Sequence, residues 1–303
     1  MIEFRKLTPE DRAPYQHLLL ESGERGCEFS FANLYLWGRQ RIAFLQGHAL
    51  LFSQFDRRTV YPFPVGSGDK KAILEAIIAD SRERGISCRI TGLTGENIRL
   101  MQTLFPDRFY YHCDRNAFDY VYAIDDLADL KGRKYQKKRN HYNRFRTAFP
   151  YYTVQPLTAA LLPAVQAMVA DWYARRMALD PTADLLMERK ALEKALVCHE
   201  QLGMDTLVLT DGDEVLAFTM ASFLTADTMD VHFEKAREDV DGAYTAINCE
   251  FARYLRNKYP HLRYLNREED MGLEGLRKAK ESYLPHHMTE KCWAHLQEDG
   301  YDY

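Results

Sequence analysis

Side chains that could transfer a proton or polarise a carbonyl group gather where two predicted strands end. Ligands of open α/β sheets bind beyond the carboxyl ends of the strands, so groups at these ends are expected to converge on one crevice. They are His232 and Glu234 at the end of the strand at 228–233, and Asn266, Arg267, Glu268 and Asp270 after the strand at 262–265. A histidine or carboxylate can act there as a base, and an amide or guanidinium can orient a carbonyl. The alternative interpretation is a solvated polar turn.

A strongly basic segment separates the two halves of the chain. Residues 131–146 hold eight Lys or Arg and no carboxylate, although the whole chain carries a net charge of −4. Aromatic residues recur through and just beyond it at Tyr135, Tyr142, Phe145 and Phe149, which predicts an amphipathic helix with a basic face. Such a face is either only solvated or binds a polyanion, such as the phosphates of RNA or lipid head groups.

Neither the cysteines nor the histidines follow a metal-binding pattern. The six cysteines all lie more than twenty residues apart, so there is no CxxC pair, and we expect buried free thiols. The ten histidines contain no HExxH or HxH motif. The sequence therefore predicts no protein-built metal site and no built-in cofactor. No serine or cysteine has a recognisable activating partner, which favours direct attack over a covalent enzyme intermediate.

The order of predicted elements occurs twice along the 303 residues. Each half reads as strand, helices, antiparallel strands, helix, strand and helix, and 4–8 and 154–158 both end in Leu-Thr before a helix. We predict an α/β protein with two mixed sheets: an N-terminal domain at 1–125, a basic linker helix at 126–149, and a C-terminal domain at 150–303 that carries the site. The element order of the second half resembles the GCN5-related N-acyltransferase (GNAT) fold.

In acyltransferases of that fold a loop reading Q/R-x-x-G-x-G/A holds the donor's phosphates. Backbone N–H groups and the positive end of a helix do the binding. Here the stretch 237–242 keeps Arg237 and Gly242, but Val240 replaces the first glycine. Three neighbours are anionic, namely Glu238, Asp239 and Asp241. Such a loop is less suited to a coenzyme A thioester, and its acids either complement the helix dipole or receive a cationic group.

Further motifs are spread over nearly the whole chain. They are Lys137, Lys138, Arg139, Asn140 and Phe145; Ile247 and Asn248; Asn266, Arg267, Glu268, Asp270 and Gly272; and Leu276, Arg277, Lys278, Ala279, Lys280, Tyr283 and Pro285. Together they resemble a bacterial family related to the C-terminal catalytic domain of phosphatidylglycerol lysyltransferases. The resemblance implies tandem GNAT-like domains, as in the Fem peptidoglycan aminoacyltransferases, and a donor of the aminoacyl-tRNA type.

We therefore predict a transferase that moves an aminoacyl or other acyl group from a carrier to an amine or hydroxyl acceptor. The predicted catalytic residues are His232, Glu234, Asn266, Arg267 and Glu268. The predicted substrate-binding residues are Asp270, Arg237, Gly242, Asn248, Arg277, Lys280 and Tyr283, with Lys137, Lys138, Arg139 and Asn140 for the phosphates of tRNA or another carrier. The alternatives are a coenzyme A-dependent N-acetyltransferase and a non-catalytic binder of nucleic acid or anionic lipid.

The acceptor is expected to be a small molecule or a lipid. No apolar run is long enough to span a bilayer, and residues 1–9 carry Glu3, Arg5 and Lys6 where a signal peptide would be apolar. We expect a cytoplasmic protein without a transmembrane segment.

Overall fold

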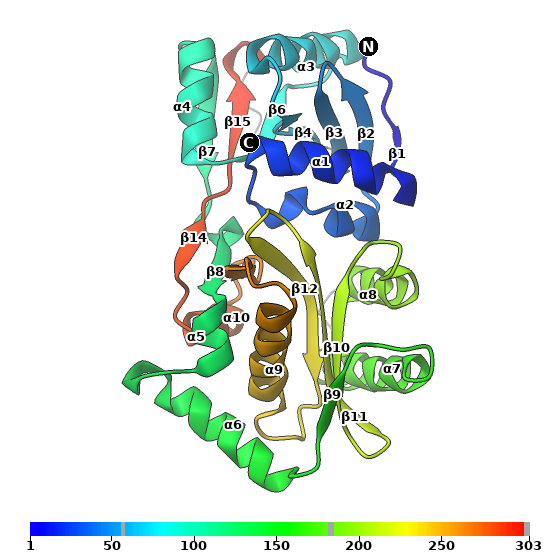
Figure 1. Ribbon diagram of the computed structural model, residues 1–303. Helices are drawn as coiled ribbons and strands as arrows, with labels where there is room; N and C mark the ends of the chain where they lie inside the picture. The colour runs from blue at the N-terminus through cyan, green and yellow to red at the C-terminus, as the bar shows by residue number, and fades with distance from the viewer. Residues whose placement is uncertain (56–57, 181–184, 300–303) are drawn as a thin grey trace. The chain divides into compact units, whose positions relative to one another are not determined.

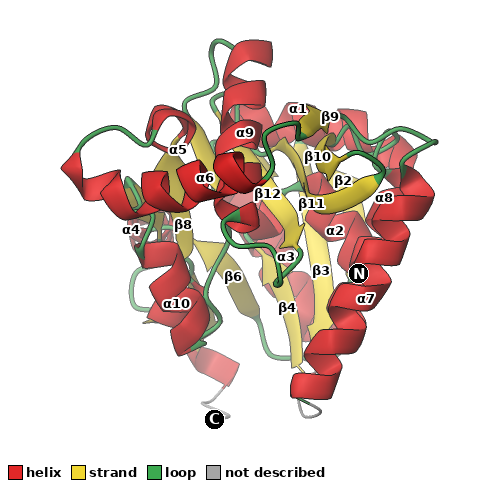
Figure 2. Cartoon of the chain, turned by 90° about the horizontal axis from the view of Figure 1, so that it is seen from below, coloured by secondary structure: helices red, strands yellow, loops and turns green. Residues whose placement is uncertain are grey.

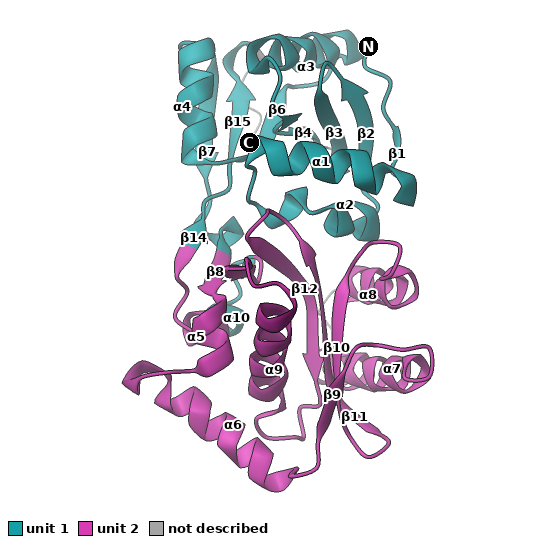
Figure 3. Cartoon of the chain, viewed as in Figure 1, with its two compact units in different colours: residues 1–119, 269–277, 288–303 teal, residues 120–268, 278–287 magenta. Residues whose placement is uncertain are grey.

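Two compact units make up the structure, a computed structural model that describes residues 1–55, 58–180 and 185–299 (Figure 3). Unit 1 comprises residues 1–119, 269–277 and 288–303, and unit 2 comprises residues 120–268 and 278–287. Both units are therefore discontinuous in sequence, whereas the sequence prediction kept all of 150–303 in one domain.

Unit 1 is built on an eight-stranded mixed sheet (Figure 1). In sheet order the strands are β1 (Arg5–Lys6), β2 (Gln40–Leu45), β3 (His48–Phe55), β4 (Arg58–Pro62), β6 (Arg89–Leu93), β15 (Cys292–Leu296) and β7 (Phe109–Cys113), with β5 (Val65–Gly66) paired to β3. The helices are α1 (Arg12–Ser22), α2 (Phe31–Trp37), α3 (Lys70–Arg84) and α4 (Gly95–Leu104). Among the described residues of this sheet, only β4 and β6 pair in parallel.

Unit 2 is built on a seven-stranded sheet with α9 on one side of β10–β12 and α7 and α8 on the other (Figure 1). In sheet order the strands are β9 (Thr153–Gln155), β10 (Asp205–Asp211), β11 (Glu214–Phe223), β12 (Thr228–Ala236), β13 (Tyr264–Asn266), β8 (Asp119–Ala123) and β14 (His287–Thr289). The helices are α5 (Ile124–Asp129), α6 (Gln136–Ala148), α7 (Leu162–Leu179), α8 (Leu186–Cys198), α9 (Ala243–Lys258) and α10 (Glu274–Glu281), which begins in the chain segment of unit 1. Strands β12 and β13 run parallel.

The two sheets repeat one strand order and exchange one strand. The order β1-β2-β3-β4-β6-β15-β7 matches β9-β10-β11-β12-β13-β8-β14, and the fourth and fifth strands are parallel in both. The sixth place in each sheet is taken by a strand from the other half of the chain, β15 in unit 1 and β8 in unit 2. This confirms the predicted repeat of mixed sheets, and the exchange explains why the units are discontinuous.

Local sequence accounts for the elements that position the site. The predicted stripe of α9 is buried at Ile247, Phe251 and Leu255, and this helix contacts β10, β11 and β12. The predicted hairpin is β10–β11, whose Gly212 has a φ of 56° in the turn. Because burying each such side chain stabilises the fold by about 1.5–3 kcal/mol, the α9 stripe fixes this helix on the sheet.

The cysteines differ from the sequence expectation at two positions. Cys113 of β7 and Cys292 of β15 form a disulfide, because the strand exchange places them directly opposite each other although 179 residues separate them in sequence. The prediction of a free thiol was wrong for both. Cys198 and Cys249 are buried free thiols, as predicted, and Cys27 and Cys88 are also buried. Among the described helices, none combines the length and the apolar character that a membrane span requires.

Candidate functional site

The predicted cluster forms in unit 2, where β12 and β13 part. The two parallel strands pair only as far as Asp230 and Asn266, while β12 continues to Ala236. The pairing of β12 with β11 skips His232, which marks a β-bulge. Bulges often re-aim a side chain beside a functional site. Beyond these strand ends Arg267 contacts Glu234, and His232 lies close to Glu268.

Glu234 holds an arginine and an amide at the centre of this cluster. Its Oε1 accepts a hydrogen bond of 2.9 Å from Arg267 Nη2, and its Oε2 accepts one of 3.2 Å from Asn248 Nδ2 of α9. The Glu234 and Arg267 side chains are only 9% and 16% exposed. Two further atoms, Arg267 Nη1 and Asn248 Oδ1, are buried and have no hydrogen-bond partner among the described residues. Around Glu234 the chain therefore has one buried donor and one buried acceptor without a hydrogen-bond partner among the described residues.

Two tyrosines and a lysine surround the arginine. The Arg267 guanidinium lies 5.6 Å from the ring centroid of Tyr122 and 5.0 Å from that of Tyr283. Lys138 Nζ lies 3.6 Å from the Tyr283 centroid. Burial, with a smaller contribution from the positive charge of Arg267, lowers the pKa of Lys138 to about 8. An amine with that pKa can exchange a proton near neutral pH.

A second group centres on His232. Its Nε2 lies 2.8 Å from Ser222 Oγ, and its Nδ1 lies 3.4 Å from Asp230 Oδ2 and 3.7 Å from Glu268 Oε1. The histidine and Asp230 side chains are fully buried, and that of Glu268 is 24% exposed. Sequence reasoning missed Asp230 and Ser222. The alternation Asp230-x-His232 on a strand was the available signal, whereas Ser222 is opposite Asp230 only through the strand register. Ser222 thus has a histidine neighbour that the sequence did not reveal.

Two predicted site residues, Asn266 and Lys280, form hydrogen bonds with the backbone of the turn that carries Arg267 and Glu268. Asn266 is buried, and its Oδ1 accepts the backbone N–H of Glu268 at 2.8 Å. Lys280 Nζ donates to the carbonyl oxygens of Arg267 at 2.6 Å and Glu268 at 3.1 Å. These bonds hold Glu268 at a φ of 57°, a left-handed conformation that costs a non-glycine residue about 1–2 kcal/mol. They fix the direction in which the Arg267 and Glu268 side chains leave the turn.

Asp270 and Arg277 belong to unit 1 and pair with each other. Arg277 Nε donates to Asp270 Oδ2 at 2.7 Å, and the backbone N–H of Gly272 donates to Asp270 Oδ1 at 2.8 Å. Asp270 is fully buried. These two predicted binding residues thus lie in unit 1, whereas the group around Glu234 lies in unit 2.

The acidic side chains of the loop between β12 and α9 all lie close to arginines of this protein. Arg237 binds Asp239 at 2.8 Å and Glu214 at 2.9 Å. The other two acids also face cations, Glu238 lying 3.7 Å from Arg176 and Asp241 lying 3.3 Å from Arg144. A phosphate or a cationic substrate group would have to compete with these pairs.

Gly242 lies where α9 approaches α6, two helices that lie side by side in Figure 2. Its φ is 82°, and a Cβ would lie 2.4 Å from the carbonyl oxygen of His141. We expect Gly242→Ala to lower the free energy of unfolding by about 2–4 kcal/mol through backbone strain and overpacking. Urea unfolding measures this. Gly212→Ala is the matched control, because its φ is 56° but no atom lies within 4 Å of a Cβ. Equal losses in the two variants would contradict the close-approach explanation.

Helix α6 confirms the predicted amphipathic helix. Tyr142 and Phe145 are buried, and the opposite side forms an open surface hollow. That hollow is lined by Lys137, Asn140, His141, Asn143, Arg144, Thr147 and Ala148. Arg139 donates to the carbonyl oxygens of Leu130 and Gly132 and so holds the preceding loop. Of the predicted carrier-binding residues, only Lys137 and Asn140 lie on the hollow.

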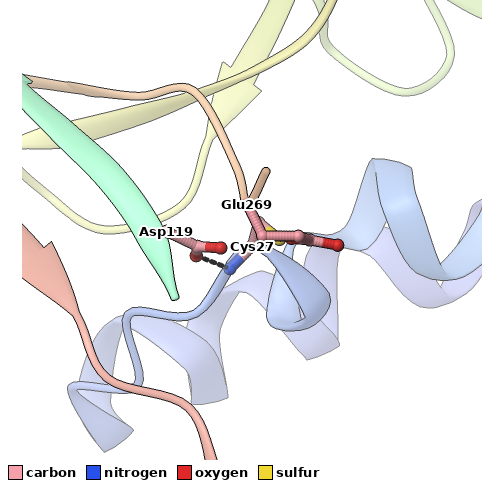
Figure 4. Close-up of side chains that lie close together, drawn as sticks. All are labelled: Cys27, Asp119 and Glu269. Carbon is pink, nitrogen blue, oxygen red and sulfur yellow. Dashed lines mark hydrogen bonds between the residues drawn. The ribbon is translucent and has the colours of Figure 1, made fainter. Parts of the chain in front are cut away.

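Unit 1 contains a buried charged cluster of its own. Cys27, Asp119 and Glu269 lie close together (Figure 4), and Lys291 Nζ lies 2.7 Å from Asp119 Oδ1, 2.9 Å from Glu269 Oε2 and 3.3 Å from Cys27 Sγ. Although burial opposes charge here, the carboxylates raise the pKa of Lys291 well above its usual value. Burial raises the pKa of the neighbouring Glu28. The lysine ammonium occupies the position that a cation would take between these ligands.

Comparison with known proteins agrees with this architecture. The sequence matches the family "Phosphatidylglycerol lysyltransferase, C-terminal" over residues 21–295. A conserved protein of unknown function from Bacteroides thetaiotaomicron is 36% identical, with a TM-score of 0.92, covering 98% of this chain and 100% of that one. L-PGS from Bacillus licheniformis is 14% identical, with a TM-score of 0.71 and coverage of 98% and 94%. FemX is 11% identical, with a TM-score of 0.63 and coverage of 97% of each chain.

A search of curated proteins gives no significant match. The match of the family covers most of the chain, and the strand order agrees with the tandem GNAT-like fold that the motifs predicted. The chain therefore belongs to the phosphatidylglycerol lysyltransferase C-terminal family and is a tandem GNAT-fold protein of the acyltransferase type.

Proposed function

We propose that the protein is an aminoacyltransferase, which moves an amino-acid residue from aminoacyl-tRNA to a hydroxyl or amine acceptor at the group formed by Glu234, Arg267 and Asn248. Membership of a family named for lysyl transfer to phosphatidylglycerol supports the reaction class. The observation that carries the proposal is the pair of buried atoms left without a partner among the described residues, Arg267 Nη1 and Asn248 Oδ1.

This pair fits an aminoacyl ester better than a simple acyl group. An aminoacyl ester presents a carbonyl oxygen, which accepts hydrogen bonds, and an α-amino group, which donates them. Arg267 Nη1 matches the carbonyl and Asn248 Oδ1 matches the amine. An acetyl group has no amine, and it would leave the Asn248 oxygen buried without a partner, at a cost of about 1–3 kcal/mol.

In the proposed reaction the acceptor oxygen or nitrogen attacks the ester carbonyl carbon. The new bond forms as the carbonyl π electrons move onto its oxygen, and Arg267 Nη1 donates to that oxyanion from a fixed position. Collapse of the tetrahedral intermediate expels the ribose oxygen of the tRNA. Lys138, as the neutral amine, takes the acceptor's proton and passes it to the leaving oxygen, so that charges and protons balance.

Glu234 has a positioning role in this scheme rather than the role of base that its residue type suggested. Both of its oxygens accept hydrogen bonds from Arg267 and Asn248, which fixes the two groups that face the substrate.

The role of Lys138 predicts a pH dependence. Because the pKa of Lys138 is lowered to about 8, the neutral amine accumulates as the pH rises through that value. We expect kcat/KM for transfer to a hydroxyl acceptor, which does not titrate in this range, to rise and level off above about pH 8. Lys138→Arg keeps the charge but cannot lose its proton, so it should lose both the rate and the rise. If Lys138→Arg keeps the pH profile of the wild-type protein, another group transfers the proton.

Helix α6 supports the proposal for the carrier. Its hollow carries Lys137 and Arg144, and basic side chains on an exposed face suit the phosphates of tRNA. Lys138 is not part of that face, since it packs on Tyr283. The carrier's backbone would therefore meet Lys137 while Lys138 serves the reacting ester.

The proposal is tested by supplying the purified full chain with tRNA charged with one radiolabelled amino acid at a time, lysine first. The acceptors are phosphatidylglycerol in detergent micelles and a panel of small amines. Transfer of label from at least one charged tRNA, in a reaction that free amino acid does not support, is the expected result. If acetyl coenzyme A is the only donor that supports transfer, the protein is an N-acetyltransferase and the proposal is wrong. Salt-dependent tRNA binding with no transfer from any donor would show a binding protein.

A further inference from the structure

We infer that the Asp230, His232 and Glu268 side chains of unit 2 form a site for one tetrahedrally coordinated divalent cation, with zinc as the best match. One atom from each side chain, namely His232 Nδ1 and one oxygen of each carboxylate, lies within 4.8 Å of the other two. This inference concerns binding, so it holds or fails independently of the donor and acceptor proposed above.

The spacing of the three atoms agrees with a tetrahedral ion. Zinc binds imidazole nitrogen and carboxylate oxygen at about 2.0–2.2 Å, so two ligand atoms on a tetrahedron lie about 3.3–3.6 Å apart. His232 Nδ1 is 3.4 Å from Asp230 Oδ2 and 3.7 Å from Glu268 Oε1. Neighbouring ligands on an octahedron around magnesium would lie closer together, at about 2.9 Å. The two carboxylate oxygens lie within 4.8 Å of each other.

A hydrogen bond between Ser222 of β11 and His232 orients the histidine ring for metal binding. Ser222 Oγ lies 2.8 Å from His232 Nε2. When Nε2 carries the proton and donates to Ser222, the lone pair of Nδ1 is left facing the two carboxylates. Metal-binding histidines regularly have such a partner on the other ring nitrogen, which fixes the ring and its tautomer.

The backbone holds the three ligands on rigid elements. Asp230 lies in the paired part of β12, His232 is at the bulge of the same strand, and Glu268 is held in its turn by Asn266 and Lys280. One histidine with two carboxylates leaves the fourth position of a tetrahedral ion for water or a ligand. Because Glu268 directly follows Arg267, the ion would also tie the turn that carries Arg267 to β12.

The unit 1 cluster is a second group of close ligand atoms in the same chain. Cys27, Asp119 and Glu269 also offer close ligand atoms, but Lys291 Nζ lies between them at 2.7–3.3 Å. A metal ion there would have to displace a buried ammonium. This cluster therefore serves as an internal control.

The test uses tag-free protein, treated with a chelator and titrated with cobalt(II), whose visible absorption is intense in tetrahedral sites, and then with zinc measured by elemental analysis. We expect one equivalent per chain. His232→Gln should abolish binding, Asp230→Asn and Glu268→Gln should weaken it strongly, and Ser222→Ala should weaken it by about 10- to 100-fold. Circular dichroism of each metal-free variant shows whether it is folded.

Two controls assign the ion to this site. Cys27→Ser should leave the affinity and the absorption unchanged, and so should replacement of the neighbouring surface histidines His286 and His287 by alanine. Loss of binding in either control would move the ion elsewhere and overturn the inference. The inference would also be overturned if the wild-type protein did not bind one equivalent, or if folded Asp230→Asn and Glu268→Gln bound the ion fully. In either case His232 would have only the structural role of a hydrogen-bonded partner of Ser222.

Discussion

Arg267→Lys is expected to lower kcat/KM for aminoacyl transfer by about 100- to 1000-fold. Lysine keeps a positive charge opposite Glu234, but it lacks the second nitrogen that Arg267 leaves for the substrate carbonyl. The loss should therefore lie mainly in kcat, because the interaction is strongest with the oxyanion of the transition state. Steady-state transfer assays, with tRNA affinity measured separately, separate the two effects.

A double variant guards against a purely structural explanation. Arg267→Met together with Glu234→Gln removes both charges of the buried pair and should stay folded while transfer is lost. Arg256→Met is the matched control, since Arg256 also pairs with carboxylates, Asp125 and Asp129, within unit 2. A folded Arg267→Lys protein with wild-type kcat would contradict the role given to this arginine.

The largest expected effect on stability is that of Lys291→Met, which should lower the free energy of unfolding by about 3–5 kcal/mol. The substitution removes the ammonium that lies between Asp119 and Glu269 and leaves the buried carboxylate of Asp119 without this cation. The Lys291 and Asp119 side chains are 9% and 0% exposed, so water cannot replace the lost charge. Urea unfolding of the full chain measures the change.

Two comparisons make this result specific. Arg82→Met breaks an ion pair with Glu298 whose side chains are 55% and 52% exposed, and it should cost at most about 1 kcal/mol. Adding Asp119→Asn and Glu269→Gln to Lys291→Met should restore part of the lost stability, because the carboxylates are then neutral. Equal losses of unfolding free energy in Lys291→Met and Arg82→Met would show that burial does not strengthen the ion pairs of Lys291.

Much of the fold was predictable because it depends on local patterns. Strand alternation, the α9 stripe and the Asp-Gly turn follow from the periodicity of the sequence, and the repeated order of elements indicated two similar sheets. The exchange of β8 and β15 was not predictable in this way. The position of a strand within a sheet depends on long-range pairing, which periodicity does not encode, and the Cys113–Cys292 disulfide depends on that exchange.

The position of the candidate site in the fold could be predicted from the sequence, but many of the contacts within it could not. The convergence of His232, Glu234, Arg267 and Glu268 follows from two parallel strands that end side by side, a general property of such sheets. The roles of Asn266 and Lys280 as supports of the turn depend on hydrogen bonds to the backbone, which residue types do not reveal. The pairing register of β11 and β12 places Ser222 beside His232. Lys138 reaches Tyr283 because it lies on the same face of α6 as the buried aromatic residues.

The most direct test of the central claim is a crystal structure of the full chain with a stable analogue of an aminoacyl-tRNA end, an aminoacyl group linked by an amide to 3′-amino-3′-deoxyadenosine. We expect the analogue's carbonyl oxygen to lie about 2.7–3.2 Å from Arg267 Nη1, and its α-amine at the same distance from Asn248 Oδ1. An analogue bound away from Arg267 and Asn248, with both atoms still lacking a partner, would contradict the account.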